Sequence, residues 1–237
     1  LLSDENCLQV VLPQGSGAII PDRGDRVGYW PMSLSAASQP GYDLVTVFAQ
    51  RVRTTGDGAL DFANVGPSVA QFIVPVGGTP QLLGVRDLNA DSADTRRPMW
   101  GAASVVDGGW LYAYGTSREN QPSVLSGFAV QVARVRPDRV TDAGAWRYFD
   151  GQGWQSDPQR AVQLIAAQGG VSQTFSVFRR GKYWYAFSKR NEFLGTDLVF
   201  WRADGPAGPF RALPAVAKLP GDAADGQLRY MPLAHPT

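Results

Sequence analysis

DGGWLYAY, at Asp107–Tyr114, is the stretch that decides the fold, because RGKYWYAF at Arg180–Phe187 repeats its pattern. Gly108 and Gly181 are 73 positions apart, and the tyrosine and alanine that follow them keep the same spacing. A weaker copy begins at Gly41, 67 positions before Gly108. A glycine turn followed by an aromatic strand at nearly constant spacing predicts a repeated structural unit.

A second short segment recurs ahead of each copy. It surrounds Met32, then Met99, then Ser172, and Met32 and Met99 are again 67 positions apart. The segment around Met231 resembles the start of one further copy. Two different strands therefore recur in register, and we expect these four segments to line one central axis.

The units read as strands joined by tight turns. Asp107-Gly108 is a hairpin signal, and Arg180-Gly181 takes the same place in the next unit. The 27 glycines and 17 prolines punctuate short apolar runs, and no run keeps a helical period for three turns. We expect little helix and predict strands at residues 101–106, 110–115, 128–135, 146–149, 171–178, 183–188 and 197–203.

Four short antiparallel strands per unit are typical of a β-propeller blade. We predict an all-β chain that forms an incomplete propeller ring of about three and a half blades, with a β-sandwich as the alternative. Residues 29–96, 97–168 and 169–229 would be complete blades. Residues 1–28 would end one blade and residues 230–237 would begin another.

Composition limits the possible functions of the 237 residues. The chain is 44% hydrophobic and 18% charged, so it can bury the core of one large domain. A formal net charge of +1 argues against nucleic-acid binding. Cys7 is the only cysteine, which excludes an intrachain disulfide and a multi-cysteine metal site. We assign no metal and no cofactor.

Neither a transmembrane segment nor a signal segment is recognisable. The chain starts at Leu1 without an initiator methionine, and we interpret it as a fragment of a longer protein. A missing signal segment therefore does not argue against a secreted or cell-envelope protein.

Several segments together resemble a known family. They are Gln173–Phe178, Tyr183–Ser188, Leu198–Ala203, Gly205–Phe210 and the closing Tyr230–Pro236. This pattern is similar to five-bladed propeller glycosidases, and within them to the bacterial domain family that contains endo-D-arabinanases. The resemblance implies a glycoside hydrolase that acts on an extracellular or cell-wall glycan. It also implies two essential aspartates on the first blade, and this sequence contains no matching pair.

Hydrolysis of a glycoside needs two carboxylates across the scissile bond. Glu192 is the candidate, because it lies in the loop that follows the strand at 183–188. The alternative is a solvated charge paired with Lys189 or Arg190. Glu119 occupies the corresponding loop of the preceding unit and has the same alternative.

Four aspartates occupy polar loops ahead of two innermost strands. Asp22 and Asp25 alternate with arginines, which is typical of a turn with local ion pairs. Asp91 and Asp94 belong to a long loop that could hold calcium, although the EF-hand spacing is absent. Arg97 ends that loop, and its guanidinium could hydrogen-bond sugar hydroxyls or a carboxylate.

The remaining candidates are substrate-binding residues. Trp30 and Trp100 occupy equivalent places on innermost strands and could stack on the apolar face of a sugar. Gln173 corresponds roughly to Trp100 and would add an amide to the same wall. The single histidine, His235, would face the channel in the family pattern, with a structural role as the alternative.

Two functions of different classes stay open at this point. One is a glycoside hydrolase of the endo-D-arabinanase-like type, and the other is a module that binds a polysaccharide or oligosaccharide without chemistry. A purely structural interaction scaffold is the third possibility, because propellers host all of these roles.

Overall fold

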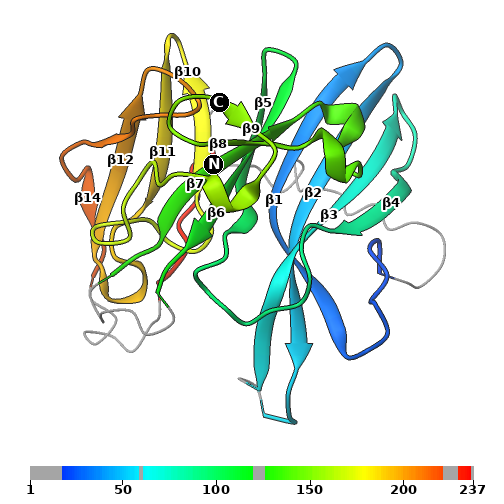
Figure 1. The fold of residues 1–237 in the computed structure, drawn as a ribbon, viewed down its shortest axis with the longest axis horizontal. Helices are drawn as coiled ribbons and strands as arrows, with labels where there is room; N and C mark the ends of the chain where they lie inside the picture. The colour runs from blue at the N-terminus through cyan, green and yellow to red at the C-terminus, as the bar shows by residue number, and fades with distance from the viewer. Residues whose placement is uncertain (1–17, 59–60, 120–125, 221–228, 236–237) are drawn as a thin grey trace, which may run out of the picture.

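The computed structural model describes residues 18–58, 61–119, 126–220 and 229–235, and Cys7 lies outside them. The described residues form three antiparallel sheets (Figure 1). Their helical parts are four 3-10 turns, at Pro137–Arg139, Ala143–Ala145, Pro158–Arg160 and Glu192–Leu194. The prediction of an all-β chain is confirmed. None of the helices in these ranges is long and apolar enough to span a membrane.

The first sheet has the longest strands, and its order is β1-β2-β3-β4. Gly41 forms the β1–β2 turn with a φ of +85°, a region that favours glycine. A bulge interrupts β1 after Pro31, and another interrupts the β2–β3 pairing after Arg51. The strands are β1 (Val27–Gln39), β2 (Tyr42–Thr54), β3 (Phe62–Pro75) and β4 (Gln81–Asp87).

The second sheet contains the hairpin that defines the repeat. Asp107 pairs with Trp110, and the two glycines between them have φ values of +57° and +75°. A two-residue turn with both values positive matches the twist of the flanking strands, so this prediction is confirmed. The strands are β5 (Met99–Asp107), β6 (Trp110–Ser117), β7 (Ala129–Val135), β8 (Arg147–Phe149) and β9 (Trp154–Gln155).

The third sheet corrects one predicted strand. The strand predicted at 171–178 begins only at Ser176, because Val171 pairs instead with Phe128 in an isolated bridge to the second sheet. The predicted strand at 197–203 is confirmed. The strands are β10 (Ser176–Arg180), β11 (Tyr183–Lys189), β12 (Asp197–Ala203), β13 (Arg211–Ala212) and β14 (Ala217–Lys218).

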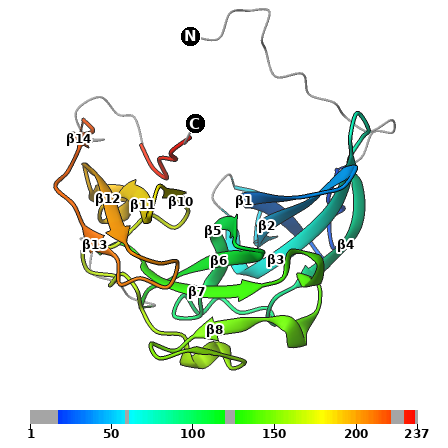
Figure 2. The same cartoon turned by 90° about the horizontal axis from the view of Figure 1, so that it is seen from above.

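The sheets stand side by side around an open space, as blades of a propeller (Figure 2). Their first strands, β1, β5 and β10, lie innermost, and β5 contacts both of the others. The Ser33 hydroxyl on β1 donates to the carbonyl of Gly101 on β5 at 2.6 Å. The C-terminal segment joins them, because the Ala234 N–H donates to the Ser176 hydroxyl on β10 at 2.9 Å. The predicted propeller class is confirmed, while the blade boundaries and a total of five blades stay predictions.

Two apolar clusters fill the spaces between neighbouring sheets. One joins the first and second sheets around Phe48, Val69 and Leu111. The other joins the second and third sheets around Tyr114 and Phe175. Burial of apolar surface between blades therefore holds the three inner strands in place around the axis.

Candidate functional site

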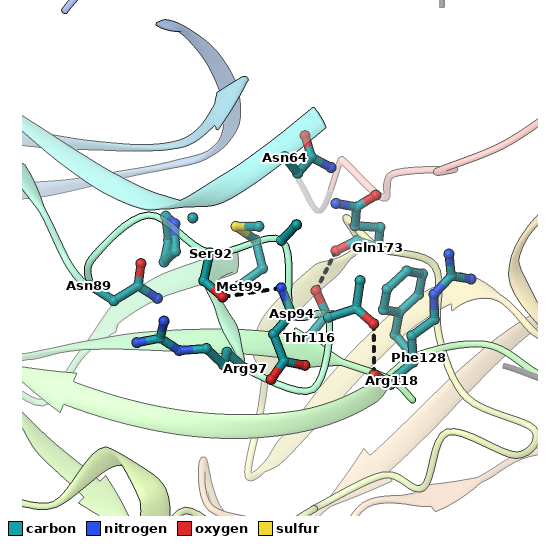
Figure 3. A pocket seen from close by; sticks show the side chains of 14 residues that line it. Asn64, Asn89, Ser92, Asp94, Arg97, Met99, Thr116, Arg118, Phe128 and Gln173 are labelled. Atoms are coloured by element: carbon teal, nitrogen blue, oxygen red, sulfur yellow. Dashed lines mark hydrogen bonds between the residues drawn. The ribbon is translucent and has the colours of Figure 1, made fainter. Parts of the chain in front are cut away.

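A pocket with polar and apolar walls opens at the end of the sheets where β5 begins and β6 ends (Figure 3). We call it the mouth pocket. Its volume is about 90 Å³. All three sheets or the segments leading into them contribute to its walls, and the polar side chains used below are Asn64, Asp94, Arg97, Thr116, Arg118 and Gln173.

Two hydrogen bonds bring the third sheet to this pocket. The Thr116 hydroxyl on β6 donates to the backbone carbonyl of Gln173 at 2.9 Å. The Gln173 side-chain amide donates to Oε1 of Gln50 on β2 at 3.0 Å. Gln173 therefore links the first and second sheets, and its own position is fixed from two sides.

The long loop between β4 and β5 forms another wall, and backbone contacts shape it. The Ser92 N–H donates to the Val65 carbonyl at 2.8 Å, and the Arg97 N–H donates to the Asp94 carbonyl at 3.2 Å. Gly66 lies under the loop with a φ of +145°. A Cβ at Gly66 would lie 2.4 Å from Oδ1 of Asn89, so only glycine lets the loop approach β3 this closely.

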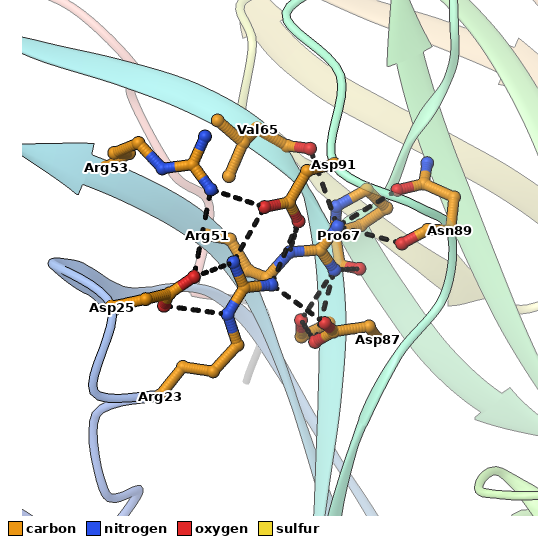
Figure 4. A network of polar contacts seen from close by, with 10 residues as sticks. Arg23, Asp25, Arg51, Arg53, Val65, Pro67, Asp87, Asn89 and Asp91 are labelled. Atoms are coloured by element: carbon orange, nitrogen blue, oxygen red, sulfur yellow. Dashed lines mark hydrogen bonds and ion pairs between the residues drawn. The ribbon is translucent and has the colours of Figure 1, made fainter.

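An ion-pair network fastens the same loop from the other side (Figure 4). Arg51 has 0% of its side chain exposed, and its guanidinium contacts Asp91 at 3.1 Å and Asp87 at 3.2 Å. Arg51 also donates to the Asn89 carbonyl at 2.8 Å. A buried arginine is stable when all of its donors find partners, as they do here.

Arginines on the exposed side complete the network. Arg23 pairs with Asp91 at 2.6 Å and with Asp25 at 2.7 Å, and Arg53 pairs with Asp91 at 2.7 Å. The hydrogen bond from Arg23 lowers the pKa of Asp91 to about 2. The expected local ion pair at Asp25 is confirmed. Asp91 is bound by guanidinium groups, which is the environment of an ion pair and not of calcium.

Two polar atoms of the mouth pocket are buried and have no hydrogen-bond partner among the residues that the structure describes. They are Oδ1 of Asn64, an acceptor, and Nε of Arg118, a donor. The Arg118 guanidinium lies 4.4 Å from the centre of the Phe128 ring. Buried polar atoms in native proteins are nearly always paired, so these two atoms are the places in the pocket where a water molecule or a ligand can add a hydrogen bond.

Glu192 lies behind Gln173. Its side chain is 2% exposed, and Oε2 accepts a hydrogen bond from the Gln173 N–H at 2.9 Å. Among the described residues its Oε1 has no partner at full hydrogen-bond geometry, and burial raises the pKa of Glu192 against the opposing effect of the nearby Ser172 side chain. The alternative of a solvated loop charge is therefore wrong for Glu192, whereas Glu119 is exposed.

The backbone at Glu192 is also unusual. Asn191 and Glu192 have φ values of +62° and +50°, which non-glycine residues rarely adopt. Such conformations persist where surrounding contacts hold them and are frequent at functional sites. Here the carboxylate contact to Gln173 is one of those contacts.

The structure brings two of the predicted substrate-binding residues together. Arg97 and Gln173 line the mouth pocket. Trp100 is 4% exposed and packs against Tyr148, with 5.1 Å between ring centres, beside a cavity of about 500 Å³ that Arg97 shares. The ligand-binding roles of all three stay predictions.

The other two predicted residues lie elsewhere. Trp30 is 45% exposed and lines a cavity of about 470 Å³ near the start of β1. His235 is exposed and lines a cavity of about 230 Å³ among the inner strands, together with Ser33 and Ser104. The predicted substrate-binding residues therefore line several separate cavities and do not form one wall.

Sequence reasoning missed Asn64, Thr116 and Arg118 in the mouth pocket. Asn64 lies inside a strand, and no sequence motif surrounds it. Arg118 is the neighbour of Glu119, in the loop that was considered only for the carboxylate of Glu119. This loop follows the repeated hairpin, and that position could have indicated Arg118 as a site residue.

A family model described as a domain of unknown function (DUF5005) matches residues 9–237. No curated protein matches the chain. Similar solved structures include a family 117 glycoside hydrolase of the marine bacterium Zobellia galactanivorans, with 16% identity over 83% of this chain and 59% of that chain and a TM-score of 0.49. The GH32 β-fructofuranosidase of Bombyx mori has 12% identity over 84% of this chain and 39% of that chain, with a TM-score of 0.48.

A third similar structure is the catalytic domain of the Coprinopsis cinerea GH62 α-L-arabinofuranosidase. It has 11% identity over 84% of this chain and 73% of that chain, with a TM-score of 0.41. The chain spans less than two thirds of the length of the first two of these proteins.

Proposed function

The chain belongs to the DUF5005 family, and we propose that its mouth pocket binds carbohydrate. The observation that carries this proposal is the pair of unsatisfied buried atoms, Oδ1 of Asn64 and Nε of Arg118, in one polar pocket. A sugar hydroxyl both donates and accepts a hydrogen bond, so a polyhydroxylated ligand can pair with both atoms once their side chains turn toward the pocket.

The rest of the lining suits the same ligand. Asn64 and Gln173 carry planar amides, Arg97 and Arg118 carry planar guanidinium groups, and Phe128 adds an aromatic surface. Such a mixture of a few converging polar groups with an apolar surface is typical of small-ligand sites. The sequence resemblance supports an arabinan-type furanoside polymer as the glycan, outside the cell or in the cell wall.

Hydrolysis is the second candidate function, and Glu192 is the observation that favours it. Burial raises the pKa of Glu192, and a carboxyl group with a raised pKa is the type of group that donates a proton to a leaving group. Hydrolysis requires a second carboxylate across the bond, and Asp94 is the carboxylate among the residues that line the mouth pocket. Reducing-end release that Glu192→Gln abolishes would support hydrolysis by this chain.

Isothermal titration calorimetry tests the binding proposal. The chain is titrated with disaccharides and pentasaccharides of arabinofuranose, xylose and mannose. Asn64→Ala removes one pocket acceptor and should weaken binding about three- to tenfold, the loss expected for one hydrogen bond. Gln81→Ala removes an exposed amide from β4 and serves as the matched control.

Binding that survives Asn64→Ala unchanged would refute the mouth pocket as the sugar site. The absence of binding to every oligosaccharide in the panel would refute the proposed function itself.

A further inference from the structure

We infer that Trp30 and Phe62 form a second sugar subsite, which extends the mouth pocket along the first sheet. We call this pair the aromatic platform. The inference rests on the proposed function, because it assigns units beyond the second of the same glycan chain to a defined surface. It predicts that a longer glycan chain binds more tightly than a short one, which the mouth pocket alone does not predict.

The strand register places the aromatic platform and the mouth pocket on one face of the first sheet. Trp30 on β1 is opposite Gln50 on β2, and Asn64 and Phe62 on β3 are opposite Val52 and Thr54 on β2. Directly paired residues share a face, and alternate residues along one strand share it too. Trp30, Gln50, Phe62 and Asn64 therefore all project to the same side.

This face is the one that turns toward the axis at the mouth. The side chain of Gln50 indicates the direction in which this face points, because its Oε1 accepts the hydrogen bond from the Gln173 amide ahead of the third sheet. Asn64 lines the mouth pocket itself. Phe62 lies two residues before Asn64 on β3, which corresponds to about 7 Å along an extended strand. A short glycan chain can therefore contact both places.

The aromatic rings present apolar surface that the described residues leave uncovered. Trp30 is 45% exposed and Phe62 is 38% exposed, and their ring centres are 4.8 Å apart at an angle of 52°. Both line the cavity of about 470 Å³ at this end of the sheet. Exposed aromatic surface beside polar groups is the usual surface on which a sugar ring stacks.

Polar groups surround the platform. Asp22, Thr54 and Asp61 line the same cavity. A sugar ring that stacks on the aromatic surface would keep its hydroxyls at the ring edge, where carboxylate and hydroxyl oxygens can accept from them. A surface for another protein would instead be expected to lack charged groups at its centre.

A structural role accounts for only part of these contacts. The packing of the two rings against each other and their place beside the buried Val52 stabilise the sheet. Much of both rings stays in solvent, so Trp30→Phe should keep most of that packing and still reduce the stacking area.

Calorimetry with the disaccharide and pentasaccharide of the sugar that binds tests the inference. Trp30→Ala should weaken pentasaccharide binding about tenfold, a stacking-sized loss, and change disaccharide binding less than about twofold. Trp30→Phe should fall between the wild type and Trp30→Ala. Leu83→Ala removes an exposed apolar side chain from β4 and is the matched control.

The outcomes separate this inference from the proposed function. The second subsite would be overturned if the wild type bound both lengths with equal affinity, or if Trp30→Ala left the pentasaccharide affinity unchanged. The proposed function would still stand in that case if Asn64→Ala weakened binding of the disaccharide. Disaccharide binding that depends on Trp30 but not on Asn64 would overturn both, because the platform would then be the primary site. The absence of any binding would overturn both as well.

Discussion

Replacing Arg51 with methionine should lower the free energy of unfolding by about 3 kcal/mol. The Arg51 guanidinium is fully buried and contacts Asp87, Asp91 and the Asn89 carbonyl. Methionine fills a similar volume and donates no hydrogen bonds. The change therefore removes the polar contacts between β2 and the loop while keeping most of the packing.

The magnitude follows from what each former partner still contacts. Breaking a buried ion pair typically costs about 3–5 kcal/mol, because one charge is left uncompensated. Asp91 keeps Arg23 and Arg53, and Asp87 keeps Arg23. The Asn89 carbonyl loses the donor described above. The cost should therefore lie at the lower end of that range.

Urea unfolding followed by tryptophan fluorescence measures the change. Arg139→Met is the matched control, because it removes an exposed ion pair with Asp142 and should cost less than about 1 kcal/mol. Arg51→Lys keeps one charge but not the fork of donors, so its loss should be intermediate. A cost of Arg51→Met no larger than that of Arg139→Met would refute the idea that this network fastens the loop.

Two further changes have defined outcomes. Gly101→Ala should lower the melting temperature by roughly 6–12 °C, since alanine is strained at a φ of +92° and its Cβ would lie 2.1 Å from Cγ of Phe48. A melting temperature within about 2 °C of the wild type would contradict that clash. Burial raises the pKa of Glu192, so the unfolded chain ionises first and the stability of the wild type should fall as the pH rises above about 4.5. Urea midpoints across this pH range should show that the fall is smaller in Glu192→Gln, and an identical fall in both proteins would contradict it.

The repeated hairpins could be predicted because the residues that form their turns are visible in the sequence. A turn with positive φ at Gly108 and Gly109 requires glycine, and the spacing of such turns reveals the blades. The register of each innermost strand has no comparable signal. Trp30 and Trp100 both lie on innermost strands, yet one is exposed and the other is buried.

Spacing explains this difference between the two tryptophans. They are 70 positions apart, whereas Met32 and Met99 are 67 positions apart, so Trp30 corresponds to Arg97 and Trp100 to Ser33. Side chains an odd number of positions apart along a strand point to opposite faces. The predicted equivalence of the two tryptophans therefore does not hold at the level of single residues.

The burial of Glu192 depends on a distant segment. Lys189, Arg190 and Asn191 precede it, and such neighbours are typical of a solvated loop. What buries the carboxylate is the segment at Gln173, which forms no strand and reaches Glu192 through a backbone N–H. The residues next to Glu192 therefore predict the loop correctly. They also predict a solvated carboxylate, whereas the carboxylate is buried.

The hydrogen bond between Gln50 and Gln173 joins residues 123 positions apart. Each sheet can form from neighbouring hairpins, whereas this contact must wait until the first and third sheets have both folded and docked. Contacts between distant parts of a chain form slowly, because the entropy of closing the intervening loop opposes them. We therefore expect the mouth pocket to be among the last parts of the molecule to assemble during folding. Ligand affinity at this pocket would then measure complete folding, whereas strand content would measure only the formation of the separate sheets.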